Sequence, residues 1–246
     1  MNFIPGLTVP LLICLTLSGC GGPQPADPLM ETIQAQDQNV ENARKRQMEE
    51  LQALQAQKTL ENLDVPAEGT FVVEFDLDAG TFEIEVHREW APIGADRFYR
   101  MVKDKYFDGA GFFRVVPGFM VQFGLAADPA MTRKWSGNLQ DDPVKQSNTK
   151  GYVTFAKTGA PNSRSSQIFI NYGNNQRLDP QGFAPFGKVI SGMDVVEEIS
   201  SAHGEQPDQN ALRARGNAYL KEVFPRLDYI STARIVKDDL ASDSGE

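Results

Sequence analysis

The chain has 246 residues, of which 41% are hydrophobic, so it can enclose a sizeable core. Its net charge of -9 argues against binding to nucleic acid or to an anionic membrane surface, because both need basic patches. Two His and two Cys leave no room for a multi-ligand zinc site or a disulfide framework. We therefore expect one globular domain with tails, and no metal chemistry built on His and Cys.

Residues 1–19 have the features of a signal peptide. They contain no charged side chain, and their apolar run from Leu7 to Gly19 is shorter than a bilayer-spanning helix. The segment ends in Leu17-Ser18-Gly19-Cys20, which resembles a bacterial lipobox. The resemblance implies acylation of Cys20 and an exported lipoprotein facing the periplasm, and Gly21 is compatible with sorting to the outer membrane. Plain secretion and an uncleaved anchor are the alternatives, since no Lys or Arg precedes the apolar run.

A tether and a helical spacer are predicted next. Residues 20–29 begin with the lipidated Cys and are rich in Gly and Pro, which favours a flexible tether leaving the membrane. Residues 30–64 contain no Gly or Pro and are rich in Gln, Glu, Ala, Lys and Arg, a composition typical of a helix. Some apolar residues share a heptad position. Two interpretations stay open, a solvated spacer and self-association through residues 30–63.

The folded domain is predicted over residues 67–237, before an acidic tail at 238–246. Alternating apolar residues predict a hairpin around the turn Asp78-Ala79-Gly80. Helical spacing follows Pro92 and again follows Met193. The predicted strands cover residues 71–77, 82–86, 112–116, 119–123, 152–155, 168–170, 186–190 and 229–236. This pattern predicts a mainly β fold, a closed antiparallel barrel capped by two helices.

Three polar or Gly/Pro-rich segments carry the candidate chemistry: residues 112–122, 155–171 and 177–189. In the first, period-two alternation predicts that Phe112 and Arg114 share a strand face. An Arg beside aromatic rings is unusual in a plain core, because an unpaired buried charge is costly. His87 and His203 have no nucleophile or ligand cluster beside them in the sequence, so we expect structural roles for both.

In this order the three segments resemble the cyclophilins, a family of peptidyl-prolyl cis/trans isomerases, over residues 67–237. Residues 112–122 match the family block F-H-R-(V/I)-(V/I)-P-G-F-M-x-Q, with Phe113 in the His position. The resemblance implies an eight-stranded barrel, no cofactor, and X-Pro segments of unfolded or flexible proteins as partners. The implied catalytic residues are Arg114, Phe119, Gln122 and Phe169. The implied substrate-binding residues are Met120, Ala156, Lys157, Gln167, Leu178 and Phe183.

The implied mechanism needs no bond to be made or broken. Amide resonance sets a barrier of about 18–20 kcal/mol, and in the twisted transition state the proline nitrogen becomes a hydrogen-bond acceptor. The Arg114 guanidinium would donate to that nitrogen, while Gln122 and a backbone N–H near Lys157 or Thr158 hold the carbonyls. We expect the enzyme to accelerate folding of exported proteins. The alternative is a proline-binding chaperone or scaffold module; a purely structural lipoprotein is disfavoured.

The sequence departs from the family pattern at several places. Phe123-Gly124-Leu125 stands where Gly-Gly-Asp is usual, which questions the loop over residues 126–142 as a substrate contact. Arg177 and Phe183 stand where cyclosporin-sensitive members carry Trp and His, so we predict weak cyclosporin binding. Residues 205–224 look like an insertion; their Arg213, Arg215 and Lys221 are interpreted as a solvated face, with a partner surface as the alternative.

Overall fold

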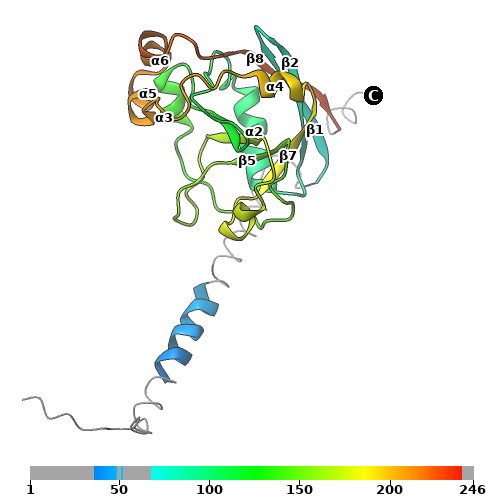
Figure 1. Cartoon of the computed structure of the whole chain (residues 1–246). Helices are drawn as coiled ribbons and strands as arrows, with labels where there is room; N and C mark the ends of the chain where they lie inside the picture. The colour runs from blue at the N-terminus through cyan, green and yellow to red at the C-terminus, as the bar shows by residue number, and fades with distance from the viewer. Residues whose placement is uncertain (1–35, 49–50, 52–67, 240–246) are drawn as a thin grey trace, which may run out of the picture. The chain divides into compact units, whose positions relative to one another are not determined.

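The computed structural model describes residues 36–48, 51 and 68–239 of the chain. The predicted signal peptide, Cys20, the tether over residues 20–29 and most of the acidic tail lie outside the described residues. The chain divides into two units, residues 1–50 and 51–246. In the first, residues 36–48 form a helix whose side chains are all exposed (Figure 1). Of the helices in the described ranges, none has the length and hydropathy to cross a membrane.

In the second unit, the described stretch from residue 68 onward opens with the predicted hairpin. Strand β1 (Thr70–Leu77) pairs antiparallel with β2 (Gly80–His87), and Leu77 lies opposite Gly80, so the turn contains only two residues. The backbone of Gly80 has a φ of 141°, a conformation that side chains rarely allow. Along both strands buried and partly exposed residues alternate, because only one face of the sheet lies against the core.

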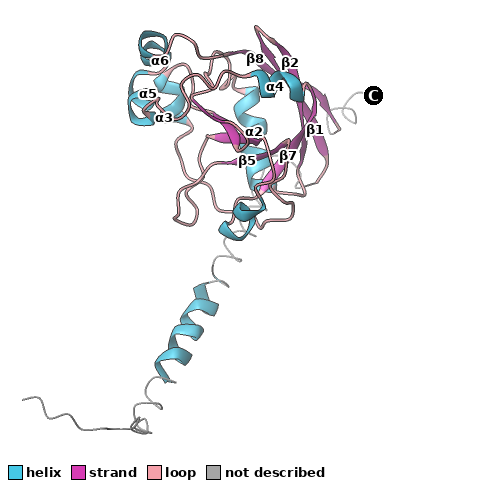
Figure 2. Cartoon of the chain, in the orientation of Figure 1, coloured by secondary structure: helices cyan, strands magenta, loops and turns pink. Residues whose placement is uncertain are grey.

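The eight predicted strands form one antiparallel sheet. The other six are β3 (Arg114–Val116), β4 (Met120–Phe123), β5 (Tyr152–Phe155), β6 (Ile168–Asn171), β7 (Pro185–Ser191) and β8 (Ile230–Asp238). Their order is β3-β4-β6-β5-β7-β2-β1-β8, and the sheet curls around the core (Figure 2). The prediction of a closed barrel was too strong, because β3 and β8 do not pair along their length. A single bridge, Gly111 to Tyr229, joins the segments just before them, which makes a curled half-barrel.

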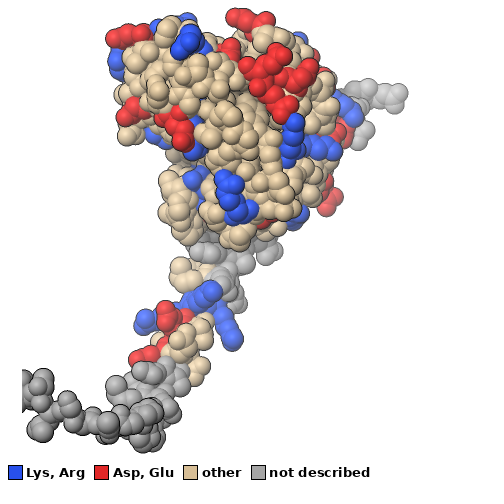
Figure 3. Space-filling model, viewed as in Figure 1, with Lys and Arg blue, Asp and Glu red and all other residues tan. Residues whose placement is uncertain are grey.

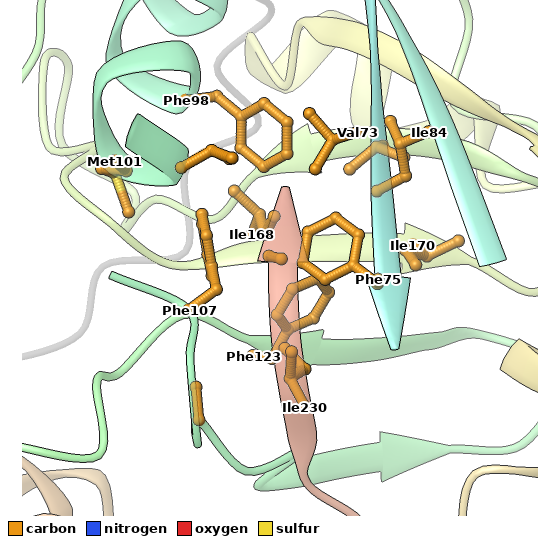
Figure 4. Packing of buried hydrophobic residues seen from close by; sticks show 14 of the residues in the cluster. Val73, Phe75, Ile84, Phe98, Met101, Phe107, Phe123, Ile168, Ile170 and Ile230 are labelled. Carbon is orange, nitrogen blue, oxygen red and sulfur yellow. The ribbon is translucent and has the colours of Figure 1, made fainter. Parts of the chain in front are cut away.

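The main core lies inside this curl and is rich in aromatic rings (Figure 4). Phe75 is fully buried, and its ring centroid lies 4.9 Å from that of Phe82 and 5.8 Å from that of Phe123. Helix α2 (Pro92–Lys103) packs Phe98 and Met101 into the same core. It begins with proline, whose fixed φ suits a first helical turn. The second predicted helix is α4 (Met193–Glu198).

The described residues contain more helices than the two predicted. The additional ones are α3 (Pro129–Lys134), α5 (Gln209–Arg215), α6 (Asn217–Val223) and a 3-10 helix, η1 (Gln176–Gln181). Helices α3, α5 and α6 lie side by side at one end of the sheet (Figure 1). Each spans only six or seven residues, and so few turns make helical periodicity an undependable signal; it indicated the equally short α4 but not these helices.

Residues 205–224, which we call the insertion, contribute four residues to a second apolar core. The insertion cluster contains Phe113, Leu125, Leu212, Tyr219, Leu220, Phe224 and Leu227. The interpretation of a solvated face therefore describes only one side of the insertion, where Arg213, Arg215 and Lys221 are exposed. Gly216 joins the two helices with a φ of 59°, and a Cβ there would lie 2.2 Å from the Ala127 carbonyl oxygen. Only glycine allows this close approach.

Candidate active site

A pocket of about 310 Å³ lies where β3, β4, β6, η1 and α5 meet. Strand alternation decides which side chains reach it. Val121 on β4 and Ile170 on β6 point into the main core, whereas Met120, Gln122 and Phe169 point into the pocket. The lining residues are Arg114, Phe119, Met120, Gln122, Ala156, Lys157, Thr158, Ser163, Ser165, Gln167, Phe169, Leu178, Phe183, Gln209 and Arg213.

One part of the pocket is apolar. Met120, Phe169 and Leu178 are buried against one another, and Phe119, Ala156 and Phe183 pack on them with part of their surface open. The Phe169 and Phe183 rings meet edge to face with centroids 6.0 Å apart. This surface can hold a small apolar ring such as the pyrrolidine of proline, and it contains no charged group that would have to be desolvated.

Beside the apolar part runs a chain of side-chain hydrogen bonds. Arg114 Nη1 donates to Gln122 Oε1 over 3.0 Å, and Gln122 Nε2 donates to Gln167 Oε1 over 2.7 Å. The two glutamines are buried, while the Arg114 side chain is 31% exposed. Strand pairing produces this order, because Arg114 lies opposite Gln122 in the register of β3 and β4. The Arg114 guanidinium, which is always charged, is thus placed at the edge of the pocket beside two buried glutamine side chains.

The Phe112 prediction was wrong. Phe112 is fully buried in the main core, with its ring centroid 4.9 Å from that of Phe123, whereas Arg114 lines the pocket. Regular strand begins only at Arg114, so period-two alternation does not extend back to Phe112. Phe113 points neither into the main core nor into the pocket, and instead packs in the insertion cluster.

The loop between β5 and β6 supplies another side of the pocket. The Lys157 ammonium contacts an Asp141 carboxylate oxygen at 2.8 Å and is almost buried. The backbone N–H of Thr158 donates to Ser163 Oγ over 3.1 Å. No hydrogen bond engages the backbone N–H of Lys157 within the part of the chain that the structure describes. Of the two N–H groups considered from the sequence, that of Lys157 is therefore the one free to bind a carbonyl oxygen.

The loop over residues 126–142 supports the pocket from outside. Among the described residues it contributes no lining side chain. Its two last carboxylates act indirectly: Asp141 holds Lys157, and Asp142 pairs at 3.0 Å with Arg164, whose side chain is buried within the loop after β5. The doubt about this loop as a direct contact surface is thus consistent with the lining residues, while its structural contribution was not visible in the sequence.

A carboxylate fastens η1, which carries Leu178, to the rest of the fold. Asp179 accepts hydrogen bonds from Ser147 Oγ at 2.5 Å and from the backbone N and side-chain Nδ2 of Asn148 at 2.9 Å and 2.8 Å. Burial is the largest single influence on the pKa of this carboxyl and acts to raise it. The hydrogen bonds together outweigh burial and hold the pKa of Asp179 below its ordinary value.

The ten residues predicted to be catalytic or substrate-binding all line this one pocket. Their roles stay predictions, and Cys20 lies outside the described residues. Sequence reasoning interpreted Arg213 as part of a solvated face and did not select Ser163, Ser165, Gln209 or Glu205, which pairs with Arg114. The two serines lie in the polar segment 155–171 that the sequence did indicate. For the other residues only the apparent extra length of residues 205–224 was a signal, and length does not say where a segment folds.

Two of the three cations that line the pocket are paired with a carboxylate. Arg114 pairs with Glu205 and Lys157 with Asp141, while Arg213 makes no ion pair within the described ranges. Figure 3 shows acidic side chains gathered over α4 and basic ones in separate small groups on that face. The described residues contain no group of three or more side chains that could hold a metal ion.

Comparison with known proteins gives a consistent result. Residues 72–215 match the family model described as cyclophilin type peptidyl-prolyl cis-trans isomerase. A peptidyl-prolyl cis-trans isomerase of Acinetobacter baylyi is 36% identical over 135 residues, which cover 53% of this chain and 72% of that protein. Peptidyl-prolyl cis-trans isomerase A of Dickeya dadantii is 34% identical over 144 residues, covering 54% of this chain and 73% of that protein.

Solved structures agree on the fold. A cyclophilin type isomerase of Cryptosporidium parvum superimposes with a TM-score of 0.52 at 22% identity, covering 68% of this chain and 97% of that one. A second crystal structure of that protein was obtained in the presence of the dipeptide Ala-Pro. Cyclophilin AquaCyp293 of Hirschia baltica gives a TM-score of 0.52 at 20% identity, covering 70% of this chain and 75% of that one.

Proposed function

Because this chain belongs to the cyclophilin-type peptidyl-prolyl cis-trans isomerases, we propose that its pocket isomerises X-Pro bonds of exported proteins and that Arg114 stabilises the transition state. The observation that carries the proposal is the hydrogen-bonded chain Arg114–Gln122–Gln167 beside the apolar Met120, Phe169 and Leu178. An apolar ring and an adjacent amide would thus meet their complements in one pocket.

The reaction needs help because amide resonance gives a barrier of about 18–20 kcal/mol, so that uncatalysed isomerisation takes tens to hundreds of seconds. When the bond twists, resonance is lost and the proline nitrogen regains its lone pair. A donor that meets this lone pair binds the twisted state better than either planar state, which is the condition for catalysis. Arg114 fits that requirement, because its guanidinium is always protonated and its donors have fixed directions.

The remaining contacts hold the substrate while the bond rotates. The pyrrolidine ring would lie on Met120, Phe169 and Leu178. The backbone N–H of Lys157 would bind a substrate carbonyl oxygen, since that of Thr158 already donates to Ser163. A charged hydrogen bond contributes about 1.5–3 kcal/mol, which corresponds to roughly one to two decades of rate. Positioning and desolvation must therefore supply the rest of the acceleration.

The Arg114 role is tested with Arg114→Ala and Arg114→Lys in the full chain, purified in detergent and assayed on an X-Pro peptide. We expect kcat/KM to fall by about ten- to a hundredfold in both variants, because Lys has no planar fork to fix its donors. The control is Arg234→Ala, which removes an exposed arginine paired with Glu74 and Asp76 on β1. Unchanged activity in folded Arg114→Ala would favour a proline-binding chaperone or scaffold.

The proposed location rests on the sequence of residues 1–20. Acylation of Cys20 would tether the enzyme to a bacterial membrane facing the periplasm, where newly exported chains arrive with mixed proline isomers. The helix over residues 36–48 would act as part of a spacer, and its exposed Val40 and Met48 are candidates for self-association. We expect Cys20→Ala to move the protein from the membrane fraction to the soluble fraction and to abolish labelling by radioactive palmitate.

A further inference from the structure

We propose that Glu205, which the insertion supplies, is a positioning residue for Arg114. Arg114 Nε donates to Glu205 Oε1 over 2.6 Å, and Nη2 contacts the same oxygen. On the other side Nη1 donates to Gln122. The guanidinium is thus held from two flanks, one belonging to the barrel and one to the insertion. The proposal rests on the proposed role of Arg114 and extends it.

The contacts with Glu205 and Gln122 leave part of the Arg114 guanidinium free to donate to a substrate. It has five N–H groups, one on Nε and two on each terminal nitrogen. Glu205 engages Nε and one N–H of Nη2, and Gln122 engages one N–H of Nη1. One N–H on each terminal nitrogen therefore remains for the proline nitrogen or a neighbouring carbonyl. Even with this contact 31% of the Arg114 side chain is exposed, so without it the flexible side chain would visit unproductive rotamers.

The backbone puts Glu205 in place. The Val115 N–H donates to the Gly204 carbonyl oxygen over 3.0 Å, so the residue after Arg114 is bonded to the residue before Glu205. On the other side of Glu205, the Asp208 backbone N–H donates to the Tyr219 hydroxyl over 3.0 Å, and Tyr219 belongs to the insertion cluster. The carboxylate is therefore carried by a segment fastened to β3 and to α6.

The test compares the isomerase activity of Glu205→Gln and Glu205→Asp with that of the wild type, each as the full chain. The Glu205 side chain is 59% exposed, and exposed ion pairs are weak, so we expect Glu205→Gln to lower kcat about two- to fivefold with KM unchanged. In Glu205→Asp, which keeps the carboxylate, kcat should fall less than in Glu205→Gln. Added salt should lower the wild-type rate toward that of Glu205→Gln, whose own rate should change little. The control is Glu222→Gln, which removes an exposed carboxylate of α6 that pairs with Arg215.

A direct readout separates positioning from a general loss of stability. In NMR spectra, the Arg114 Nε–H signal should exchange slowly with water in the wild type and quickly in Glu205→Gln, at equal melting temperature. An unchanged kcat in Glu205→Gln would overturn the proposal. A raised kcat would also overturn it, because it would mean that the carboxylate blocks Arg114. Full activity in Arg114→Ala would instead defeat the proposed function itself, so the two failures are distinguishable.

A different observation carries a second inference, about substrate choice. We infer that Arg213 binds an acidic side chain close to the proline of the substrate. Gln209 and Arg213 are four residues apart on α5, share one face of the helix, and line the pocket. Arg213 contacts the side chain of Asn210 at 3.3 Å but has no carboxylate partner among the described residues. The other two lining cations, Arg114 and Lys157, are each neutralised by a carboxylate.

The pocket therefore has one uncompensated positive charge, and a substrate carboxylate is the complementary group. The test uses X-Pro peptides with Glu, Gln or Lys at each of the two residues before and after the X-Pro pair, with rates measured by NMR exchange. We expect one position where Glu exceeds Lys by about two- to fivefold in kcat/KM. Arg213→Gln should abolish that preference, whereas Arg215→Gln, on the same helix outside the pocket, should keep it. Equal rates at all positions, or a preference kept in Arg213→Gln, would refute the inference.

Discussion

The pocket has two sides with different origins. The barrel side is built by β3, β4, β6, η1 and the loop between β5 and β6, and it carries the three segments that resemble the family motifs. The insertion side is built by α5 and Glu205, which match no motif. The barrel side stands on the large aromatic core, the insertion side on a small cluster to which Phe113 and Leu125 contribute. The barrel side was recognised by its motifs, whereas Glu205 and α5 lie largely within the residues matched by the family model and yet carry no motif that reveals their place beside the pocket.

Two departures from the family pattern that look unrelated in the sequence lie in the same cluster of the structure. Phe113 stands where the family has His, and Leu125 where it has Asp. Both are buried in the insertion cluster, against residues such as Leu212 and Leu220. A polar or charged group at either position would be buried without a partner, which is costly. Phe113 and Leu125 therefore suit the apolar cluster to which residues 205–224 contribute.

The largest effect is expected from Phe75→Ala, which breaks the aromatic core that supports the barrel side. Phe75 is fully buried and contacts the rings of Phe82, Phe98, Phe107 and Phe123. Removing it should lower the free energy of unfolding by about 3–5 kcal/mol, measured by chemical denaturation. Val236→Ala, at an exposed position of β8, should change it little. A loss below about 1 kcal/mol for Phe75→Ala would mean that the core repacks.

A smaller and local effect is expected from Leu220→Ala, which loosens the insertion side alone. Leu220 is fully buried in the insertion cluster, and its truncation should cost about 2 kcal/mol or more. Hydrogen exchange should quicken in α5 and α6 but not in β1 and β2, and isomerase activity should fall because Glu205 loses its support. The matched control is Val223→Ala, an exposed position on the same helix. Equal acceleration of exchange in β1 would show that the two cores unfold as one.

Acid should loosen the barrel side through Asp179. The folded chain holds the pKa of this carboxyl below its ordinary value of 3.8, so the charged form stabilises the fold. That stabilisation is complete above the ordinary value and is lost as the pH falls through the lowered one. We expect less than about 1 kcal/mol, since the carboxyl is partly exposed. Thermal melts from pH 5 to pH 2, the range set by these pKa values, should show a slope that Asp179→Asn removes.

The control for this acid effect is Asp194→Asn, an exposed carboxyl on α4. It should keep the slope of the wild-type chain. A wild-type slope that persists unchanged in Asp179→Asn would assign the acid sensitivity to other carboxyls and would contradict the prediction.

The smallest effect on the protein itself is expected at the rim. The Arg177 guanidinium lies over the Phe119 ring, 4.6 Å from its centroid. By the family resemblance of the sequence, Arg177 stands where cyclosporin-sensitive members carry Trp. Arg177→Trp should change the free energy of unfolding by no more than about 0.5 kcal/mol, as is usual at exposed positions. It should nevertheless strengthen inhibition by cyclosporin in a titration. Potent inhibition of the wild type would contradict the prediction of weak binding.

The sequence predicted the strands well because one face of each is buried. Alternation located both strands of the first hairpin, and three motifs located ten residues that line one pocket. Prediction from the sequence failed where strands end and where helices are short. Phe112 lies just outside a strand, and the short helices α3, α5 and α6 have too few turns for periodicity to register. The contact between Arg114 and Glu205 joins residues far apart in the chain, which no local pattern reports.

The insertion cluster also bears on how the protein can be shortened. Excising residues 205–224 to obtain a minimal enzyme would uncover Phe113 and Leu125, and with them the partly buried Tyr229 that packs on the cluster. Adjacent apolar side chains left in water form a sticky surface that promotes aggregation. A truncated protein would therefore need polar replacements at these positions to remain monomeric. Residues 205–224 are thus needed to cover part of the apolar surface of the domain.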